Sequence, residues 1–465
     1  MASTARRTRP PNADLARLIE ASGASHKSLA LRVNQLTHAA GIETDYSHTS
    51  VANWCRRGMT PKWPVPKLLS QAISERLGRP VNLGEIGMGE AETIDADVGL
   101  DFPRDPADAV RVATSFWSSV NRRDFLTGTG SGFAASAFTT PVTRWLVTPA
   151  DETADHKGGK QVGRADLNEL REAAEEARRW DSKYGGGNWK ANSVTDCLDH
   201  GAAPLLEGSF SDEIGRELFS VTAELSRLAG WTAFDVGEHD AAQRHFIQAL
   251  RLARAGGDVQ LGCYVLTTMA MQTLMRGFAS EAVDMAQGAF NRAKGQAVPR
   301  VLAFTKLIEA RAHARENDPR AASRALKASE DLLGQAKDDS GDEPAWIDFY
   351  AHSRLSADAA EVFRDLKNPK AALTWNQQAS AMPTGVFTRS VGMRLAIVGT
   401  AHLQARDLDH GLELGNRSID ILARVQSARA KDYVREFNTA LAPWRREPTV
   451  REFIHRTRTE LGVAA

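Results

Sequence analysis

The sequence contains few of the residues that build extracellular or metal-binding proteins. Its 465 residues include only three cysteines, Cys55, Cys197 and Cys263, which are far apart and form no C-x-x-C pair. This pattern predicts neither a disulfide framework nor a zinc site. We expect three reduced, mostly buried thiols, as is typical of a cytoplasmic protein.

Long apolar runs and catalytic motifs are also missing. The first thirty residues have no hydrophobic segment of a signal peptide, and no stretch has eighteen apolar residues in succession. The twelve histidines form no H-E-x-x-H or similar ligand spacing, and neither G-x-S-x-G nor a Walker loop occurs. We therefore expect no membrane partner, no metal, no cofactor and no enzymatic activity.

The charge is balanced overall but distributed unevenly. Lys+Arg and Asp+Glu both total 58, so the net charge is zero. Residues 1–80 contain twelve basic and five acidic residues, or +7, whereas residues 81–160 contain seven and twelve, or −5. A basic head on a nearly neutral body indicates a polyanionic partner at that end.

Residues 12–78 have the pattern of short amphipathic helices, in segments 12–23, 25–41, 47–58 and 65–78. In the third segment Val51 and Trp54 face inward, so the small polar side chains face outward and can reach base edges in a DNA groove. The predicted base-reading residues are His48, Thr49, Ser50 and Asn53. At the end of this helix Arg56, Arg57 and Lys62 are predicted to contact phosphates.

The stretch SHTSVANWCRRG resembles the recognition helix of the lambda-repressor-like (XRE) family, whose pattern is roughly S-x-x-T-I-S-x-W-E-x-G. Ser47, Ser50, Val51, Ala52 and Trp54 match this pattern. Two departures are that Cys55 replaces the usual acidic residue and that the preceding turn, THAAGIETDY, is long. The resemblance implies a helix-turn-helix DNA-binding domain over residues 1–80. The alternatives are another small bundle, or a domain that has drifted to protein binding.

An acidic, glycine-rich segment over residues 81–163 is predicted to be a linker or irregular arm. It contains NRRDFLTGTGSG at 121–132, which looks like a twin-arginine export signal. Export signals act at the N-terminus, and export of a chain with a nucleic-acid-binding head makes no physical sense. We interpret the stretch as a helix end or arm in which Phe125 and Leu126 pack on a neighbour, followed by a hinge.

Small residues recur in the body of the chain with spacings of twelve and then seven positions. The five sets are Gly230–Ala242–Ala249, Ala270–Ala282–Ala289, Ala310–Ala322–Ser329, Ala360–Ala372–Ala379 and Gly399–Gly411–Ser418. The steps between sets are 40, 40, 50 and 39 residues, and the long step coincides with the insertion AKDDSGDEP. Two antiparallel helices approach closely only where both carry small side chains, so this spacing predicts a helical repeat array.

The spacing resembles the tetratricopeptide repeat over residues 213–422, with Gly237, Phe246 and Phe363 at places where that family prefers glycine or an aromatic residue. Most repeats lack the terminal proline of the family. Together with the helix end WDSKYGGG, the chain resembles a group of actinobacterial regulators associated with sporulation and antibiotic production. The resemblance implies an all-α fold in which a helix-turn-helix domain precedes a tetratricopeptide-like superhelix over residues 164–445 and a C-terminal tail over 446–465.

Stacked repeats form a concave face lined by the first helix of each pair. Its predicted lining is aromatic and Met-rich at one end and arginine-rich at the other, which suits a short peptide or an amphipathic acid. These residues are Arg227, Trp231, Phe234, Tyr264, Met271, Met275, Phe304, Arg311, Arg315, Arg354 and Arg364. The alternative is that they pack against one another or against the arm.

These observations favour a cytoplasmic transcriptional regulator that binds duplex DNA as a homodimer and responds to a peptide or small-molecule effector in its repeats. The dimer is expected because one small head covers only a short site. A different class of function is also open. The chain could be an adaptor that holds a partner protein and does not read DNA.

Overall fold

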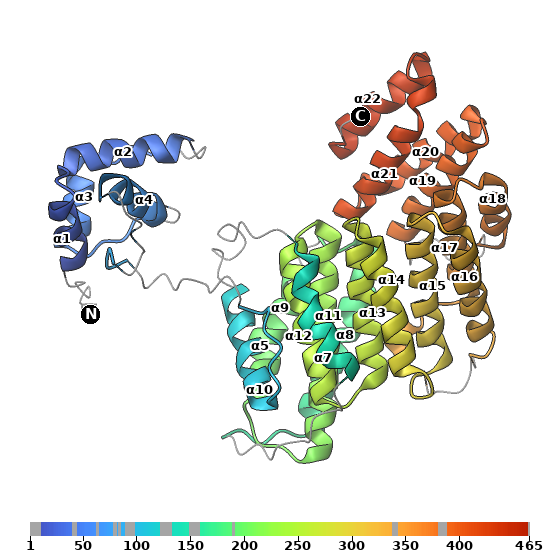
Figure 1. Cartoon of the computed structure of the whole chain (residues 1–465), viewed down its shortest axis with the longest axis horizontal. Helices are drawn as coiled ribbons and strands as arrows, with labels where there is room; N and C mark the ends of the chain where they lie inside the picture. Colours follow the sequence, from blue (N-terminus) through green and yellow to red (C-terminus); the bar gives the residue numbers. More distant parts are fainter. Residues whose placement is uncertain are drawn as a thin grey trace, which may run out of the picture. The chain divides into compact units, whose positions relative to one another are not determined.

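The structure is a computed structural model, and it describes residues 11–39, 44–61, 65–77, 81, 85–88, 98–120, 133–147, 159–187, 191–336, 343–379 and 388–463. The chain divides into two compact units, one containing the described residues up to Met88 and the other those from Val98 onward. Apart from an isolated bridge between Gln161 and Ser209, the described regular structure is helical (Figure 1). None of the described helices is both long and apolar enough to cross a bilayer.

The described residues of the first unit form four helices: α1 (Ala13–Ala21), α2 (His26–Ala39), α3 (His48–Arg56) and α4 (Val65–Leu77). The predicted apolar faces are confirmed, because Leu15, Leu18, Ile19, Leu29, Val33, Val51 and Trp54 are all buried in one core. Helix α2 packs against both α3 and α4. The short helices are therefore held by a shared core rather than by their own propensity.

The first unit continues beyond residue 80, where we expected it to end. Val81, Ile86 and Met88 are buried in the same core. The side chain of Asn12 donates hydrogen bonds to the carbonyl oxygens of Ile86 (2.8 Å) and Gly87 (3.1 Å). This contact ties the start of α1 to the end of the unit, so part of the segment predicted as linker belongs to the head.

Within the described residues of the second unit, five antiparallel helix pairs follow the predicted repeats (Figure 1). The pairs are α11 (Asp212–Val236) with α12 (His239–Ala255), α13 (Val259–Met275) with α14 (Ala279–Ala293), α15 (Pro299–Arg315) with α16 (Pro319–Leu333), α17 (His352–Asp365) with α18 (Pro369–Gln378), and α19 (Thr388–Gln404) with α20 (Leu408–Leu422). The insertion between the third and fourth pairs ends in a short 3-10 helix, η3 (Ala345–Ile347). The prediction of an all-α repeat array is confirmed.

The small residues allow the two helices of a pair to touch. In the fifth pair a Cβ on Gly399 would lie 3.1 Å from the carbonyl oxygen of Gly411, and a Cβ on Gly411 would lie 3.3 Å from that of Gly399. Serine at the third small position adds a hydrogen bond. Ser329 donates to the carbonyl of Ala303, and Ser418 to that of Gly392, both at 2.7 Å and both 26 residues back.

Each turn between paired helices contains a residue in the left-handed conformation, seven positions after the first small residue. These residues are Gly237, Gly277, Asn317, Lys367 and Arg406. Glycine adopts this conformation readily, whereas other residues do so at an energetic cost. The turn geometry is therefore the same in all five pairs, although the sequence supplies glycine in only two.

Part of the predicted arm is helical and belongs to the second unit. Helices α5 (Pro106–Val120) and α7 (Thr139–Val147), with the 3-10 helix η1 (Ala135–Phe138) before α7, contact α12. The apolar stripe of α5, which includes Val110, Ala113, Phe116 and Trp117, is buried. The acidic composition of the segment predicts an irregular arm, but its apolar residues recur with helical periodicity and form this stripe. The twin-arginine-like residues 121–132 lie outside the described residues.

Polar side chains of α12 hold the segment that precedes α5. Gln248 donates to the carbonyl oxygen of Gly99 at 2.8 Å, and Arg251 donates to that of Pro103 at 2.6 Å. Gly99 has φ +82°, and a Cβ there would lie 2.8 Å from the ring of Phe116. Together with the packing of α5 and α7 against α12, this contact explains why residues 241–255 of α12 are all buried.

The remaining helices flank the array in sequence: α8 (Arg164–Tyr184), α9 (Ala191–Asp196), the π-helix η2 (Cys197–Ala202), α10 (Ala203–Leu206), α21 (Ala428–Ala440), η5 (Ala442–Trp444) and α22 (Pro448–Leu461). Both α8 and α21 contact α11 and α19, so they join the first pair to the fifth. The predicted tail is the packed helix α22, because Val450, Phe453 and Leu461 form a buried stripe against the end of the array.

Candidate functional site

Helix α3 presents the polar side chains that the sequence predicts as base readers. His48 and Thr49 are exposed, and Ser50 and Asn53 are half-buried. Arg56 and Arg57 are exposed at the C-terminal end of the helix. Lys62, the third predicted phosphate contact, lies outside the described residues. The structure thus brings six of the seven predicted residues onto one short helix and its C-terminal cap.

Buried contacts fix the position of α3. Its Trp54 packs into the core and meets the ring of Tyr46 edge-on, with 5.1 Å between the ring centroids. Asn34 of α2 donates to the carbonyl of Tyr46 and accepts from its backbone N–H, both at 2.9 Å. These two bonds hold the segment that leads into α3. We missed Asn34 in the sequence, because a single asparagine on a helix gives no signal of a distant backbone partner.

Two residues of α3 have structural roles. The hydroxyl oxygen of Ser50 accepts a hydrogen bond from the backbone N–H of Ser47 at 3.2 Å, which caps the helix. Cys55 is buried, and burial raises the pKa of its thiol despite the nearby Arg56. A thiol with a raised pKa is poorly reactive at neutral pH, so Cys55 serves the core.

In the second unit, the aromatic residues of the predicted groove are in contact with other side chains. Trp231 donates its indole N–H to Asp181 of α8 at 3.0 Å, and the guanidinium of Arg429 lies 4.7 Å from the Trp231 ring centroid. Tyr264 stacks on Trp346 with 4.8 Å between centroids, and Arg227 lies over its ring. The other members of this set are also packed: Phe234, Met271 and Phe304 are buried, and Met275 is half-buried.

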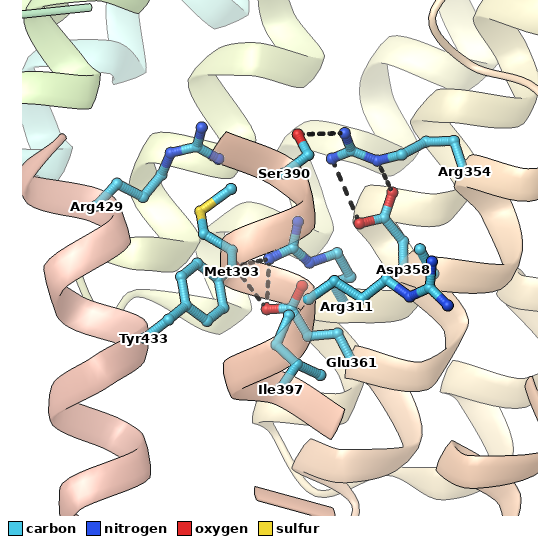
Figure 2. Close-up of a pocket in the computed structure, with 11 residues that line it drawn as sticks. Arg311, Arg354, Asp358, Glu361, Ser390, Met393, Ile397, Arg429 and Tyr433 are labelled. Carbon is cyan, nitrogen blue, oxygen red and sulfur yellow. Dashed lines mark hydrogen bonds and ion pairs between the residues drawn. The ribbon is translucent and has the colours of Figure 1, made fainter. Parts of the chain in front are cut away.

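The arginine-rich end of the predicted groove forms a buried polar network. Arg311 donates to the carboxylate of Glu361 at 2.7 Å and to the hydroxyl of Tyr433 at 3.0 Å (Figure 2). Tyr433, from α21, donates its own proton to Glu361 at 2.8 Å. Burial alone would raise the pKa of Glu361, but Arg311 and then Arg364 outweigh it and hold this pKa below its ordinary value. Glu361 is therefore ionised at neutral pH.

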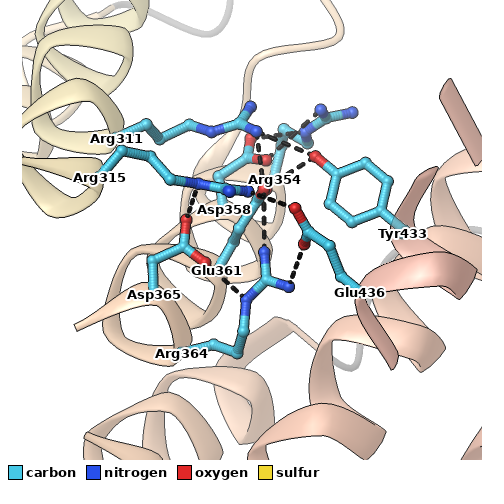
Figure 3. Close-up of polar contacts among 9 residues, drawn as sticks. All are labelled: Arg311, Arg315, Arg354, Asp358, Glu361, Arg364, Asp365, Tyr433 and Glu436. Atoms are coloured by element: carbon cyan, nitrogen blue, oxygen red, sulfur yellow. Dashed lines mark hydrogen bonds and ion pairs between the residues drawn. The ribbon is translucent and has the colours of Figure 1, made fainter. Parts of the chain in front are cut away.

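A second set of ion pairs continues this network along α17 and α21 (Figure 3). Arg315 contacts Asp365 at 2.7 Å and Glu436 at 2.9 Å, and Arg364 contacts Glu436 at 2.7 Å. Arg354 contacts Asp358, also at 2.7 Å. The four arginines predicted at this end of the groove, Arg311, Arg315, Arg354 and Arg364, thus have carboxylate partners within the chain, as the alternative of a self-filled groove requires.

A buried carboxylate that we did not predict joins the ends of the array. Asp235, at the end of α11, is fully buried and accepts four hydrogen bonds. The donors are Arg389 (2.8 Å), Ser427 (2.9 Å), Arg429 (3.1 Å) and the backbone N–H of Gly186 (3.0 Å). The two arginines come from α19 and α21, so Asp235 connects segments more than 150 residues apart in the chain.

Asp235 and the groups that donate to it form a clamp that joins α8, α11, α19 and α21. The motif WDSKYGGG, which the sequence predicts as a helix end, belongs to this clamp. Its Asp181 accepts two hydrogen bonds from Arg389, at 2.9 and 3.0 Å. A Cβ on Gly186 would lie 2.6 Å from the carbonyl oxygen of Thr232, and one on Gly187 would lie 2.6 Å from the side chain of Gln426. Glycine is required there because α8 ends directly against α11 and the start of α21. The motif was the available signal for this clamp.

Fold and sites together define an all-helical repeat protein that also contains a small helical unit with an exposed polar helix. Residues 15–89 match the family model described as the SP15 N-terminal domain. This range corresponds to the described part of the first unit from within α1 to Met88. No curated protein matches the chain.

Proposed function

We propose that the chain is a transcriptional regulator that reads duplex DNA with α3 of its first unit. The observation that carries the proposal is the exposed polar face of α3, held by Val51 and Trp54 in the core and followed by Arg56 and Arg57. The positive charge of residues 1–80 supports it, because most of the affinity of such proteins comes from phosphate contacts. The resemblance to XRE-type regulators agrees with this role.

The division of labour within α3 follows from its geometry. The side chain of Asn53 makes no hydrogen bond with another described residue. It can offer its amide to a base edge, where a bidentate contact to adenine is the usual role of asparagine. Ser50, which caps the helix through its oxygen, can still donate its proton. Arg56 and Arg57 lie at the end of the helix, where side chains meet the phosphate backbone.

A protein-binding adaptor is the second candidate function. Leu31 on α2 and Met59 after α3 are exposed by 62% and 50%, although both are large and apolar. Isolated exposed apolar residues are common, but two of them in so small a unit favour an apolar partner over a phosphate backbone. Under this reading Leu31→Ser would weaken capture of the partner, whereas Asn53→Ala would change nothing.

The experiment that separates the two functions measures DNA binding by the full chain over a range of salt concentrations. DNA sites are selected from a random duplex library, and affinities are then measured by fluorescence anisotropy. If the chain reads DNA, the selection enriches one sequence. The slope of log affinity against log salt concentration then becomes shallower by about one for Arg57→Ala. Failure to enrich any sequence, together with unchanged weak affinity in Arg57→Ala, would refute DNA reading.

Matched variants assign the roles of individual residues. Asn53→Ala is expected to cost about 1–3 kcal/mol on the selected site and little on random DNA. Arg57→Ala is expected to weaken binding to both. Arg17→Ala is the control, because Arg17 is an exposed cation on α1 that pairs with its neighbour Asp14. It removes one positive charge from the same unit without touching α3.

We also propose that the repeat unit controls the head. The predicted effector contacts Arg311, Arg315 and Arg364 are bound to Glu361, Asp365 and Glu436, which leaves little reason for an acidic ligand to displace them. Control would then act through α21, which supplies Tyr433 and Glu436 to these contacts. A ligand that changes the packing of α21 against α17 and α19 would also change the contacts of Asp235 with Arg389 and Arg429.

A further inference from the structure

A small cavity remains between α15, α17, α19 and α21 (Figure 2). Its volume is about 30 Å³, which is room for roughly two water-sized groups. Its charged lining residues are Arg311, Arg354, Arg394, Arg429, Asp358 and Glu361. Four guanidinium groups therefore face two carboxylates in a space that admits no peptide and no large ligand.

Two of the four arginines are neutralised in place. Arg311 is bound to Glu361 and Arg354 to Asp358, each at 2.7 Å. Arg354 also donates to the hydroxyl oxygen of Ser390 at 3.3 Å, and this leaves the Ser390 proton available to another acceptor. The excess positive charge of the walls comes from the other two arginines.

Arg394, on α19, has no carboxylate partner among the described residues. Its guanidinium donates to neutral oxygens only: the side chain of Asn376 at 2.8 Å, and the carbonyls of Ala379 at 2.5 Å and Asn376 at 3.2 Å. Burial lowers the pKa of Arg394, and no nearby acid opposes this effect. A half-buried, permanently charged group without a counter-ion is unusual, because desolvating a charge is costly.

Arg429, on α21, is only 6% exposed and is partly satisfied. Its Nε donates to Asp235 at 3.1 Å, but Asp235 is shared with Arg389. Its two terminal nitrogens make no hydrogen bond with a described residue. Figure 2 shows its guanidinium extending from α21 toward Met393 and Ser390 on the wall of the cavity. It is thus a buried donor with unused hydrogen-bonding capacity directed at the empty space.

We propose that this cavity binds a single oxyanionic group, the carboxylate or phosphate of a small ligand. Arg354, Arg394 and Arg429 would donate to its oxygens, and Ser390 would add a hydroxyl donor. Guanidinium groups are well suited to both anions because their N–H groups match the spacing of the oxygens. The inference rests on the proposed control by the repeat unit and names the chemistry of the effector's anchoring group.

Occupancy would have a defined mechanical effect. The three arginines come from three different helices, α17, α19 and α21, so one bound anion links all of them. It would offset the repulsion among these cations and hold α21 against the fourth and fifth helix pairs. An anion that binds only the native arrangement stabilises it by an amount that grows with the logarithm of the ligand concentration above Kd.

The test uses the full chain without DNA, so that its failure is distinct from a failure of DNA reading. Thermal unfolding is followed while sodium phosphate or sodium acetate replaces sodium chloride at constant ionic strength, and titration calorimetry measures binding of the same anions. With one of the two anions we expect saturable binding in calorimetry and a Tm that rises with the logarithm of its concentration. The probe that saturates then identifies the anchoring group as a phosphate or a carboxylate.

Arg394→Gln is the decisive variant, because Arg394 has no ion pair to lose. It should weaken anion binding at least tenfold and abolish most of the Tm rise. Ser390→Ala should weaken binding less and serves as a second variant with little risk to folding. Arg417→Gln is the matched control and should respond like the original chain, because Arg417 is an exposed arginine on α20 that pairs with Glu413. No saturable binding of either anion, or an unchanged response in Arg394→Gln, would overturn the proposal.

Discussion

Replacement of Asp235 by alanine should be among the most destabilising single changes in the chain. The substitution removes the acceptor of four hydrogen bonds and leaves the buried guanidinium groups of Arg389 and Arg429 facing an apolar methyl group. Breaking a buried ion pair by removing one partner typically costs about 3–5 kcal/mol. Since Asp181 still neutralises Arg389, Arg429 would account for most of this loss.

The measurement is urea denaturation of the full chain followed by far-UV circular dichroism, because urea does not screen ion pairs as a guanidinium salt does. Glu413→Ala is the control. Its carboxylate is 61% exposed and pairs with Arg417 at 3.6 Å, so its loss should cost less than about 1 kcal/mol. If Asp235→Ala lost no more stability than Glu413→Ala, the assignment of Asp235 as a clamp between the ends of the array would be wrong.

The same carboxylate predicts a pH dependence. Burial would raise the pKa of Asp235, but the charges of Arg389 and Arg429 outweigh burial and hold it below its ordinary value. A lowered folded-state pKa means that the stabilisation is present above the unfolded-state pKa near 4 and is lost as pH falls through the folded-state value. The loss of stability on acidification should therefore be smaller in Asp235→Ala than in the original chain.

Three further predictions concern other parts of the molecule. Burial lowers the pKa of His245 to about 3, so near pH 6.5 the unfolded chain binds a proton that the native state does not bind. The free energy of unfolding measured in urea should therefore fall as pH drops below 6.5, and His245→Phe should lessen this fall. Lys367 occupies a left-handed turn position that is glycine in two other repeats, so Lys367→Gly should stabilise the chain by about 0.5–1 kcal/mol, whereas Gly277→Ala should destabilise it. Light scattering at micromolar concentration should give the mass of a dimer, and a monomer with full operator affinity would contradict the proposed two-fold binding.

The repeat array was predictable because close helix contacts leave a record in the sequence. Positions such as Gly399 and Gly411 must be small, and they recur at the period of the turns. The polar face of α3 was predictable for a similar reason, since Val51 and Trp54 fix which side faces the core. Periodicity of this kind depends only on local geometry, which a sequence displays directly.

Apart from the motif WDSKYGGG that contains Asp181, the clamp could not be predicted because its other members share no local pattern. Asp235, Arg389 and Arg429 are charged residues on helices, and such residues are usually solvated. Only the path of the chain brings α8 and α21 between the first and fifth pairs. The same limit applies to the predicted groove, where Arg311 is buried and Arg315 is exposed, and where the spacing could not reveal that Glu361 and Asp365 meet them.

The contact between the first and fifth pairs limits how such a chain can evolve. In an open repeat protein each unit contacts only its neighbours, so units can be gained or lost at little cost. Here an added or deleted pair would separate Asp235 on α11 from Arg389 on α19 and leave buried charges without partners. Duplication of a repeat is the usual route by which such arrays change length. In this chain it should therefore prevent stable folding. The buried ion pair between Asp235 and Arg389 therefore constrains the number of helix pairs between α11 and α19, whereas loops such as the one between the third and fourth pairs remain free to lengthen.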